Sequence, residues 1–152
     1  MKIPVKLIFG GKIPVFKTDG AVCCDCYSRV ENFEEATVDK NGKKVIVIPE
    51  GKRKLIPLGF ILELPVGWEA VVRPRSGNSL KGIDISIGTI DYDYRGEVMA
   101  NVVNNTGLPL EIYHWDRICQ LAIRQVPGVD FELVENVSET ARGSQGFGHT
   151  GI

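Results

Sequence analysis

The sequence predicts an all-β domain of the jelly-roll sandwich or barrel type, with one short helix at most. Short runs of β-branched and apolar residues recur along most of the chain, and glycine and proline separate them. No long stretch has helical periodicity. The chain has 152 residues, 43% of them hydrophobic and 24% charged, so one domain with a core of its own is expected.

The first predicted strand is Lys2–Phe9, which is largely apolar. Glu35–Val38 and Lys44–Ile48 flank Asp39-Lys40-Asn41-Gly42, and Asn-Gly between two such runs indicates a β-hairpin, because both residues tolerate positive φ. A short helix is expected at Ser76–Lys81, with Ser76 as its N-cap. Further strands are expected at Leu58–Leu64, Glu69–Arg73, Asp84–Ile87, Glu97–Asn104, Leu110–His114 and Ile118–Gln125.

The end of the chain has a different composition. From about Glu135 it becomes polar and then rich in glycine, and such a segment buries too little apolar area to offset the entropy lost on ordering. We therefore expect a single domain over 1–152, with a β core over about 1–135 and a mobile lid over about 136–152. Arg142 and Phe147 are the side chains there with most to offer a ligand.

Charge and composition exclude several classes of function. The net charge is −1, so neither nucleic acid nor a membrane surface is an expected partner, and an anionic ligand requires a local cluster of cations. No apolar run is long enough to span a bilayer, and the first ten residues do not resemble a signal peptide, so a cytoplasmic, non-secreted protein is expected.

Four cysteines are present, and Cys23 and Cys26 form a C-x-x-C pair. A zinc site normally needs a second pair or histidines at ligand spacing, and His114 and His149 are isolated. Reduced cytosolic thiols are the simpler interpretation, and the role of Cys23, Cys24 and Cys26 stays open.

Two segments have the chemistry of a site. Arg73-Pro74-Arg75-Ser76-Gly77 offers guanidinium, hydroxyl and backbone N–H groups suited to a phosphate, although a solvated turn would use the same residues. Gly88–Gly96 is expected to form a tight hairpin that presents Asp91, Asp93, Tyr94 and Arg95. A carboxylate in such a turn can activate water, but acidic residues also favour turns for structural reasons.

Taken in order, five segments of the chain resemble the motifs of the trimeric dUTP pyrophosphatases. They are Val22–Cys26 around Asp25, Pro74–Gly77, Gly88–Gly96, Asp116–Leu121, and Arg142 through Gly151. The second, third and fifth match almost letter for letter. The first departs most, because only Asp25 remains of the usual Ala-Gly-Tyr-Asp-Leu. The hairpin at Asn41-Gly42 resembles an insertion relative to compact family members.

The resemblance implies a homotrimer that splits dUTP into dUMP and diphosphate, supplies dUMP and keeps uracil out of DNA, with active sites shared between subunits. It implies that Asp91 is the general base, and that Mg²⁺ bridges the phosphates while Asp25 contacts it through water. The implied substrate-binding residues are Arg75, Ser76, Gly77, Gly88, Thr89, Ile90, Asp91, Tyr94, Met99, Gln120, Arg142, Phe147 and Gly148.

Within that resemblance each group has a distinct implied role. Tyr94 packs on the deoxyribose and leaves no room for a 2′-hydroxyl, while backbone groups of Ile85–Asp91 and Met99 recognise uracil. Arg142 reaches the γ-phosphate and Phe147 stacks on the base as the lid closes. Asp93, Asp116 and Arg117 are assigned mainly to structure and subunit contacts.

Two alternatives remain open from the sequence. A dCTP deaminase shares the fold and needs a glutamate near the base, a position that Glu97 could occupy. The other alternative is a regulator that binds a protein partner in response to dUTP, with the Asn41-Gly42 hairpin as the partner surface.

Overall fold

The structure is a computed structural model that describes residues 1–146. Within that range the chain forms twelve strands and one short helix. In chain order they are β1 (Val5–Leu7), β2 (Cys23–Tyr27), β3 (Thr37–Val38), β4 (Lys44–Ile48), β5 (Arg53–Pro57), β6 (Phe60–Leu62), β7 (Trp68–Arg73), α1 (Ser76–Ser79), β8 (Ile83–Ser86), β9 (Gly88–Ile90), β10 (Met99–Asn104), β11 (Leu110–Tyr113) and β12 (Arg117–Gln125). The predicted all-β class is confirmed.

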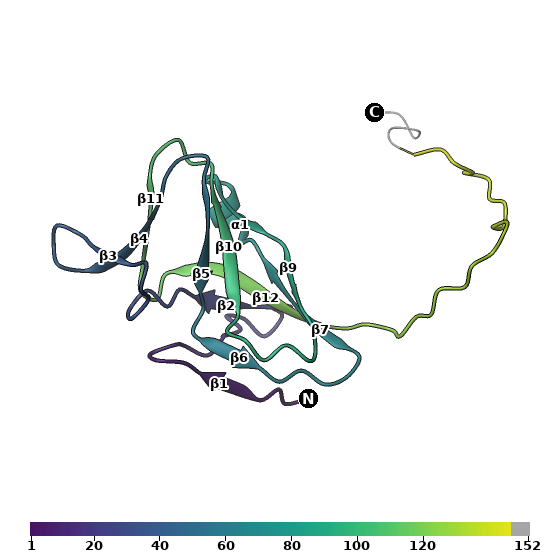
Figure 1. Cartoon of the computed structure of the whole chain (residues 1–152), viewed down its shortest axis with the longest axis horizontal. Coiled ribbons are helices and arrows are strands. Elements are labelled where there is room, and N and C mark those ends of the chain that lie inside the picture. Colours follow the sequence, from purple (N-terminus) through teal and green to yellow (C-terminus); the bar gives the residue numbers. More distant parts are fainter. Residues whose placement is uncertain (147–152) are drawn as a thin grey trace.

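The strands form four antiparallel sheets around a common core (Figure 1). The sheet orders are β1-β6, β5-β10-β8, β11-β4-β3 and β2-β12-β7-β9. Strands β10 and β12 are central and long, and along β10 every second side chain is buried, as a strand with one face on the core requires. The arrangement agrees with the jelly-roll-like architecture that the sequence predicts.

One cluster of buried side chains joins all four sheets. Phe60, Ile48, Ile56, Leu58 and Val102 are fully buried in it, and each comes from a different strand or from the turn beside one. At about 25 cal/mol per Å² of apolar surface, burying each such side chain contributes roughly 1.5–3 kcal/mol. This core fixes the strand ends from which the candidate site residues project.

The β3–β4 hairpin forms as predicted. The N–H of Asp39 donates to the carbonyl of Lys43, and the N–H of Gly42 donates to the carbonyl of Asp39. Of the two turn residues, only Gly42 has positive φ, at 79°. Asn41 does not adopt this conformation, since one glycine is enough to reverse the chain here.

Other predicted elements are corrected in detail. The helix begins at Ser76, but its N-cap is Arg75, without a side-chain cap. The carbonyl of Arg75 instead accepts the N–H groups of Asn78 and Ser79, so Ser76 already lies inside the first turn. Three strands were not predicted: β2, β5 and β9. Of these, β2 matters most, since it contains Asp25.

The predicted hairpin over Gly88–Gly96 is also wrong. Strand β9 pairs with β7, whereas β10 pairs with β5 and β8, so the strands on either side of the segment belong to different sheets. The chain also changes sheet at Ile87, between β8 and β9. The segment is therefore a corner of the sandwich, and its polar residues lie where two sheets diverge.

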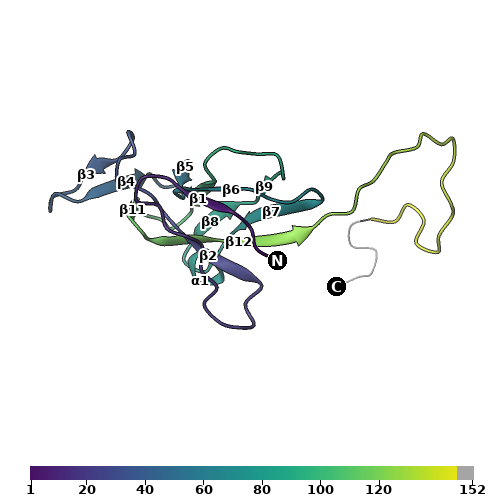
Figure 2. The ribbon, with the colours of Figure 1, turned by 90° about the horizontal axis from the view of Figure 1, so that it is seen from below.

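Beyond β12 the chain leaves the sheets. The last backbone bond to the body joins the N–H of Val126 to the carbonyl of Gly67 at 2.8 Å, and the segment over 127–146 then extends away (Figures 1 and 2). Phe131 and Leu133 in this segment are 98% and 100% exposed. The predicted division at about residue 135 between core and lid stays a prediction.

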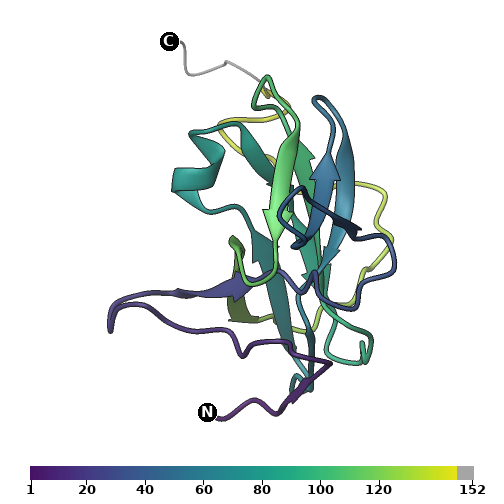
Figure 3. The same cartoon turned by 90° about the vertical axis from the view of Figure 1, so that its left-hand side faces the viewer.

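The segment that precedes β2 projects from the body (Figures 2 and 3). It exposes Phe16 and Val22, and a bridge between Val15 and Asp25 marks the point where it joins the sheet. In the part of the chain that the structure describes, no helix has the length and apolar character that crossing a membrane requires.

Candidate active site

Asp25 lies at the centre of a cationic cluster. Strand β2 pairs with β12 so that Asp25 stands opposite Gln120. The Asp25 carboxylate accepts a hydrogen bond from Nε of Arg75 at 3.1 Å and one from Nη1 of Arg117 at 3.2 Å. Its side chain is 12% exposed, so burial strengthens these charge-assisted bonds relative to a surface pair.

Backbone carbonyl groups hold the polar side chains of this cluster in place. Nη1 of Arg75 also donates to the carbonyl of Arg117 at 3.2 Å, and the Asn78 amide donates to the carbonyls of Arg117 and Ile118. The Gln120 amide donates to the carbonyl of Pro74 at 2.8 Å. Two guanidinium groups thus share the Asp25 carboxylate beside an open pocket of about 270 Å³, whose walls also include Glu111 and Asp116.

The predicted residues Arg75, Asp25 and Gln120 are therefore together in this cluster. Ser76 and Gly77 are exposed at the start of α1, directly after Arg75. Arg117 was assigned by the sequence mainly to structure, yet its guanidinium shares Asp25 with Arg75 and is half exposed. The cluster has the composition of a phosphate site, with cations, an amide and a hydroxyl.

Buried thiols lie beside Asp25 on β2 and β12. A hydrogen bond with the Cys26 thiol, together with burial, raises the pKa of Cys24 far above its ordinary value. A hydrogen bond with Cys119 and burial likewise raise the pKa of Cys26. These thiols stay protonated at neutral pH and pack as small apolar groups. In residues 1–146, no three His, Cys, Asp or Glu side chains are arranged to hold a metal ion.

A second pocket, of about 190 Å³, lies at the corner between the sheets. It brings together most of the predicted base- and sugar-side residues, from β9, the turn that follows it and the start of β10. The lining residues are Val72, Gly88, Thr89, Ile90, Asp91, Tyr94, Glu97, Val98 and Met99. The predicted residues Gly88 to Asp91, Tyr94 and Met99 therefore lie together in this pocket.

The turn after β9 presents Asp91 and Tyr94 to this pocket. The N–H of Tyr94 donates to the carbonyl of Asp91 at 3.1 Å, and Arg95 donates to the carbonyls of Tyr92 and Tyr94. The Tyr94 hydroxyl donates to the carbonyl of Glu97 at 3.1 Å. Asp91 is exposed, so its carboxylate is accessible to water at the rim of the pocket.

Glu97 lines the same pocket, but its carboxylate is fully engaged. Arg29 donates to both carboxylate oxygens at 2.8 Å, and the N–H of Gly59 donates to one of them at 2.8 Å. A glutamate held in this way by a bidentate guanidinium is not free to carry protons to and from a base. This geometry removes the main structural argument for a deaminase.

The two pockets lie apart in one chain. Ile90 stands opposite Ala70 on β7, and Asp25 reaches β7 through Gln120, which stands opposite Arg73. Asp91 and Asp25 are thus separated by three strand spacings and about four residues along the strands. With ~4.8 Å between strands and ~3.4 Å per residue, their backbones lie about 20 Å apart. The predicted site residues therefore form two groups rather than one.

Of the predicted lid residues, Arg142 is described, and it does not line either pocket. Nε of Arg142 donates to the carbonyl of Gln145 at 2.9 Å, within a local turn that Gly143 closes with φ of 54°. That turn lies in the segment that extends away from the sheets (Figure 1). Phe147 and Gly148 lie outside the described residues, so their predicted roles stay predictions.

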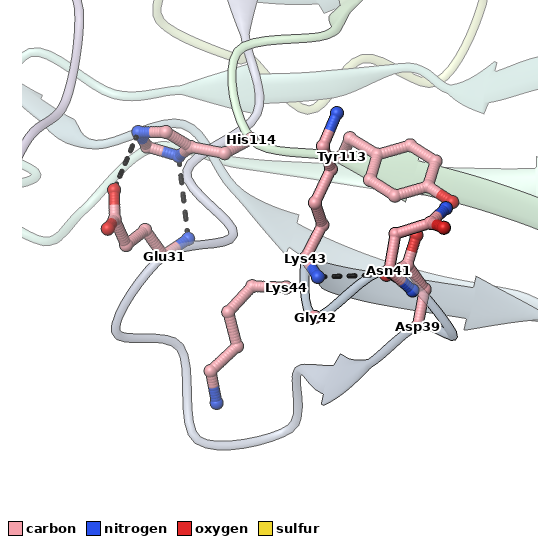
Figure 4. A pocket seen from close by; sticks show the side chains of 8 residues that line it. All are labelled: Glu31, Asp39, Asn41, Gly42, Lys43, Lys44, Tyr113 and His114. Atoms are coloured by element: carbon pink, nitrogen blue, oxygen red, sulfur yellow. Dashed lines mark hydrogen bonds and ion pairs between the residues drawn. The ribbon is translucent and has the colours of Figure 1, made fainter.

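A larger pocket, of about 510 Å³, is elsewhere (Figure 4). It lies beside the β3–β4 hairpin, and its walls include Glu31, Asp39, Tyr113 and His114. A hydrogen bond from the N–H of Lys43 lowers the pKa of Asp39, and a hydrogen bond to Glu111 raises the pKa of Tyr113 to about 12. Among its walls His114 pairs with Glu31, and none of the motif residues lines it, so chemistry rather than size identifies the site.

Comparison with known proteins identifies the family. A family model described as dUTPase matches residues 35–151, which include four of the five motifs. The chain belongs to the dUTPase family. A deoxyuridine 5'-triphosphate nucleotidohydrolase from Rhizobium rhizogenes is 42% identical over 146 residues, which cover 94% of this chain and 87% of the relative. One from Anaeromyxobacter sp. is 38% identical over 143 residues, with 92% and 88% covered.

Solved dUTPase structures share the fold. A dUTPase of Staphylococcus bacteriophage 80alpha, solved with dUpNHpp, superposes with a TM-score of 0.82 at 20% identity, covering 99% of both chains. A dUTPase of phage phi11 of S. aureus, whose structure shows the coordination of a structural Mg(II) ion, has a TM-score of 0.73 at 19% identity and covers 90% of this chain and 98% of that one. At these identities the likeness concerns the fold.

Proposed function

We propose that this chain hydrolyses dUTP to dUMP and diphosphate, with uracil and deoxyribose bound at the corner pocket and the phosphates at the Asp25 cluster. One observation carries the proposal: Gly88 to Asp91, Tyr94 and Met99, which the motif places at the nucleoside, line one pocket. Membership of the dUTPase family supports the choice of substrate. The engaged carboxylate of Glu97 argues against deamination at the same pocket.

Uracil recognition rests on backbone groups. Strand β9 is the outer strand of its sheet, so within the described chain one side of Gly88–Ile90 has N–H and C=O groups without a strand partner. Such an edge can donate to the uracil carbonyl oxygens and accept from its ring N–H, while the backbone of Met99 approaches from β10. Cytosine would leave these groups unpaired, at a cost of ~1–3 kcal/mol for each buried group.

Asp91 is the general base of the proposed reaction. Its exposed carboxylate holds a water molecule and accepts a proton from it as the water oxygen attacks the α-phosphorus in line. A bond forms between that oxygen and the α-phosphorus, the bridging bond from the α-phosphorus to the β-phosphate oxygen breaks, and diphosphate leaves. Tyr94 packs its ring on the deoxyribose, and its hydroxyl stays bonded to the carbonyl of Glu97.

Phosphate binding uses the cationic cluster. Arg75, Ser76, Gly77 and Gln120 hold phosphate oxygens, and Arg117 adds positive charge beside them. The glycine-rich end contributes Arg142 toward the γ-phosphate, and Phe147 and Gly148 toward the base. Over its described part, residues 127–146, this segment is exposed and forms no strand, which suits a part that orders only on binding.

The residues present fit a magnesium ion that arrives with the triphosphate. Asp25 has four lone-pair positions, of which Arg75 and Arg117 occupy two, so its carboxylate can still accept from water in the hydration shell of a metal ion. Bound Mg²⁺ would offset the phosphate charge and orient the leaving diphosphate. No protein cage is required, because Mg²⁺ keeps several waters and uses few protein ligands.

The proposal includes a homotrimer whose sites are shared between subunits. The separation of about 20 Å between the backbones of Asp91 and Asp25 in one chain supports it, because a nucleotide at the corner pocket then meets phosphate ligands from a second copy. The exposed Phe131 and Leu133 support it too, since they alternate with acidic residues in a strand-like pattern without a partner in the described chain. Free cysteines in the described residues suit the proposed cytoplasmic location.

A substrate panel tests the reaction. Diphosphate release is measured with dUTP, UTP, dTTP and dCTP, each with and without Mg²⁺, and ammonia release from dCTP is measured beside it. Only dUTP with Mg²⁺ is expected to react rapidly, and Asp91→Asn should lose turnover while still binding dUTP in calorimetry. A wild-type protein that leaves dUTP intact, or full turnover by Asp91→Asn, would reject the proposal.

Mixing two inactive variants tests the shared site. Asp91→Asn and Arg75→Ala are each expected to be inactive, but in mixed trimers one subunit can supply Asp91 and its neighbour Arg75. Random mixing then restores about a quarter of the wild-type rate, because about three quarters of trimers are mixed and each has one intact site of three. Unmixed samples at the same concentration are the control, and no recovery after verified subunit exchange contradicts the shared site.

A further inference from the structure

We propose that Glu97 is a positioning residue that sets the place of Tyr94 and thereby contributes to discrimination between deoxyribose and ribose. The inference rests on the proposed function, in which Tyr94 packs against the sugar. It concerns a buried ion pair between Glu97 and Arg29 that touches none of the reacting atoms. No motif role was predicted for either side chain of this pair.

The pair is a rigid anchor. Nε and Nη2 of Arg29 donate to the two different oxygens of Glu97, both at 2.8 Å, which is the parallel bidentate geometry. The Arg29 and Glu97 side chains are 9% and 19% exposed. The N–H of Gly59 adds a third bond, so the carboxylate is fixed from two segments that are far apart in sequence.

Gly59 is built into this anchor. Its φ is 77°, and a Cβ placed there would stand 3.1 Å from Cδ of Arg29 and 3.2 Å from its Cβ. The backbone of Gly59 therefore comes close to the aliphatic part of Arg29 while its N–H reaches the Glu97 carboxylate. Arginine, glycine and glutamate form one packed unit.

The backbone after Glu97 is fixed as well. The N–H of Val98 donates to the carbonyl of Phe60 at 2.9 Å, and the carbonyl of Val98 accepts the N–H of Leu58 at 3.0 Å. Val98 is 1% exposed. Arg29 holds the side chain of Glu97, and the core holds the next residue, Val98. The carbonyl oxygen of Glu97 is therefore fixed in position.

That carbonyl oxygen is the acceptor for Tyr94. The Tyr94 hydroxyl donates to it at 3.1 Å, while the ring is 45% exposed and has little core packing to hold it. The position of the ring therefore depends on the position of the Glu97 carbonyl. A catalytic ligand or sugar barrier displaced by ~1 Å can lose ~10²-fold in rate, so this dependence has consequences for selectivity.

A purely stabilising ion pair would behave differently. Loss of a buried pair that only stabilises the fold lowers activity toward dUTP and UTP alike, through the fraction of folded protein. Loss of a positioning anchor raises the relative rate with UTP, because the ring no longer blocks the 2′-hydroxyl. The ratio of the two kcat/KM values is thus independent of how much protein is folded.

The experiment compares four variants of the full-length chain with wild type. Glu97→Gln keeps the shape but faces Arg29 with an amide N–H₂, Arg29→Lys keeps the charge but loses the fork, and Tyr94→Phe removes the hydroxyl bond alone. The fourth variant joins Glu97→Gln and Tyr94→Phe. Glu35→Gln, which removes the exposed Lys54–Glu35 pair, is the matched control. For each, kcat and KM are measured with dUTP and UTP, and thermal unfolding is recorded.

The dUTP-to-UTP ratio of kcat/KM is expected to fall about tenfold in Glu97→Gln, Arg29→Lys and Tyr94→Phe, and to stay at the wild-type value in Glu35→Gln. The double variant should lose no more selectivity than either single change, since both act on one contact. Unchanged ratios in folded Glu97→Gln or Arg29→Lys overturn the inference, and so does an unchanged ratio in Tyr94→Phe, which leaves the core intact. Absence of dUTP hydrolysis by wild type instead rejects the proposed function.

Discussion

Gly96 leaves the space that the Tyr94 ring occupies, and replacing it tests that geometry directly. A Cβ at residue 96 would collide with the hydroxyl and Cζ of Tyr94 and would stand 2.9 Å from its Cε2. Ordinary contacts of a Cβ with carbon are 3.4 Å or longer. In Gly96→Ala the ring must therefore retreat by about 1 Å, a shift that the bond to the Glu97 carbonyl does not allow.

The expected changes in stability and rate follow from the hydrogen bond and the position that the Tyr94 ring loses. The exposed hydroxyl bond is worth about 0.5–1.5 kcal/mol, so the free energy of unfolding should fall by no more than about that amount. A displacement of ~1 Å at a sugar-binding ring can reduce the rate ~10²-fold, so kcat/KM for dUTP should fall between about tenfold and a hundredfold. The rate with UTP should fall less, because the retreating ring opens space beside the 2′-carbon.

Steady-state kinetics with dUTP and UTP measure this, alongside urea unfolding. Gly20→Ala is the control, because a Cβ at residue 20 meets nothing within 4 Å and that glycine does not have positive φ. If Gly96→Ala retains wild-type kcat/KM and selectivity, the ring of Tyr94 does not occupy the position that bars ribonucleotides. A large loss of stability without a change in selectivity would assign Gly96 to the fold alone.

Three further predictions follow from other parts of the molecule. Asn104→Ala removes three buried side-chain hydrogen bonds and should lower the free energy of unfolding by about 3 kcal/mol in urea titrations, at ~1 kcal/mol for each bond. Asn105→Ala, which changes an exposed neighbouring residue, should alter the free energy of unfolding little. Above pH 9, stability should fall by about 1.4 kcal/mol per pH unit for each of Cys24 and Cys26, because the unfolded thiols ionise there while the folded ones, with raised pKa values, stay protonated. Under reducing conditions Cys24→Ala should flatten this slope, and an unchanged slope would contradict the buried-thiol assignment. Ending the chain after Glu139 should leave the unfolding transition in place and remove most dUTP turnover, whereas a full rate would exclude a catalytic role for the glycine-rich end.

Sequence patterns predicted the regular parts of this fold because those parts follow local rules. Strand β4 lies at Lys44–Ile48 as predicted, since a run of β-branched residues and an Asn-Gly turn act within a few residues. Strand β2 escaped prediction because Cys-Cys-Asp-Cys-Tyr lacks the β-branched residues that mark strands. Its place is determined by pairing with β12, a contact between segments far apart in sequence.

The candidate site shows the same division. The residues from Gly88 to Asp91 and Tyr94 are close in sequence, so a motif identifies them and the structure gathers them in one pocket. Glu97 was missed as an anchor because its partner Arg29 is distant and no local pattern links the two. Arg117 was assigned to structure because nothing in its motif indicates that β2 brings Asp25 beside it.

Strand β7 separates the Asp25 cluster from Asp91 within one sheet of the chain. Along one edge β7 forms six residue pairs with β12, and along the other it forms three with β9. The cluster at Asp25 cannot approach Asp91 of the same chain without breaking those ladders, since both are attached to the same rigid sheet. In the proposed trimer each chain supplies half of two different sites rather than one complete site. We infer that turnover depends on subunit association as strictly as on Asp91, so dilution well below the dissociation constant of the trimer should abolish activity while every β-strand described here remains folded.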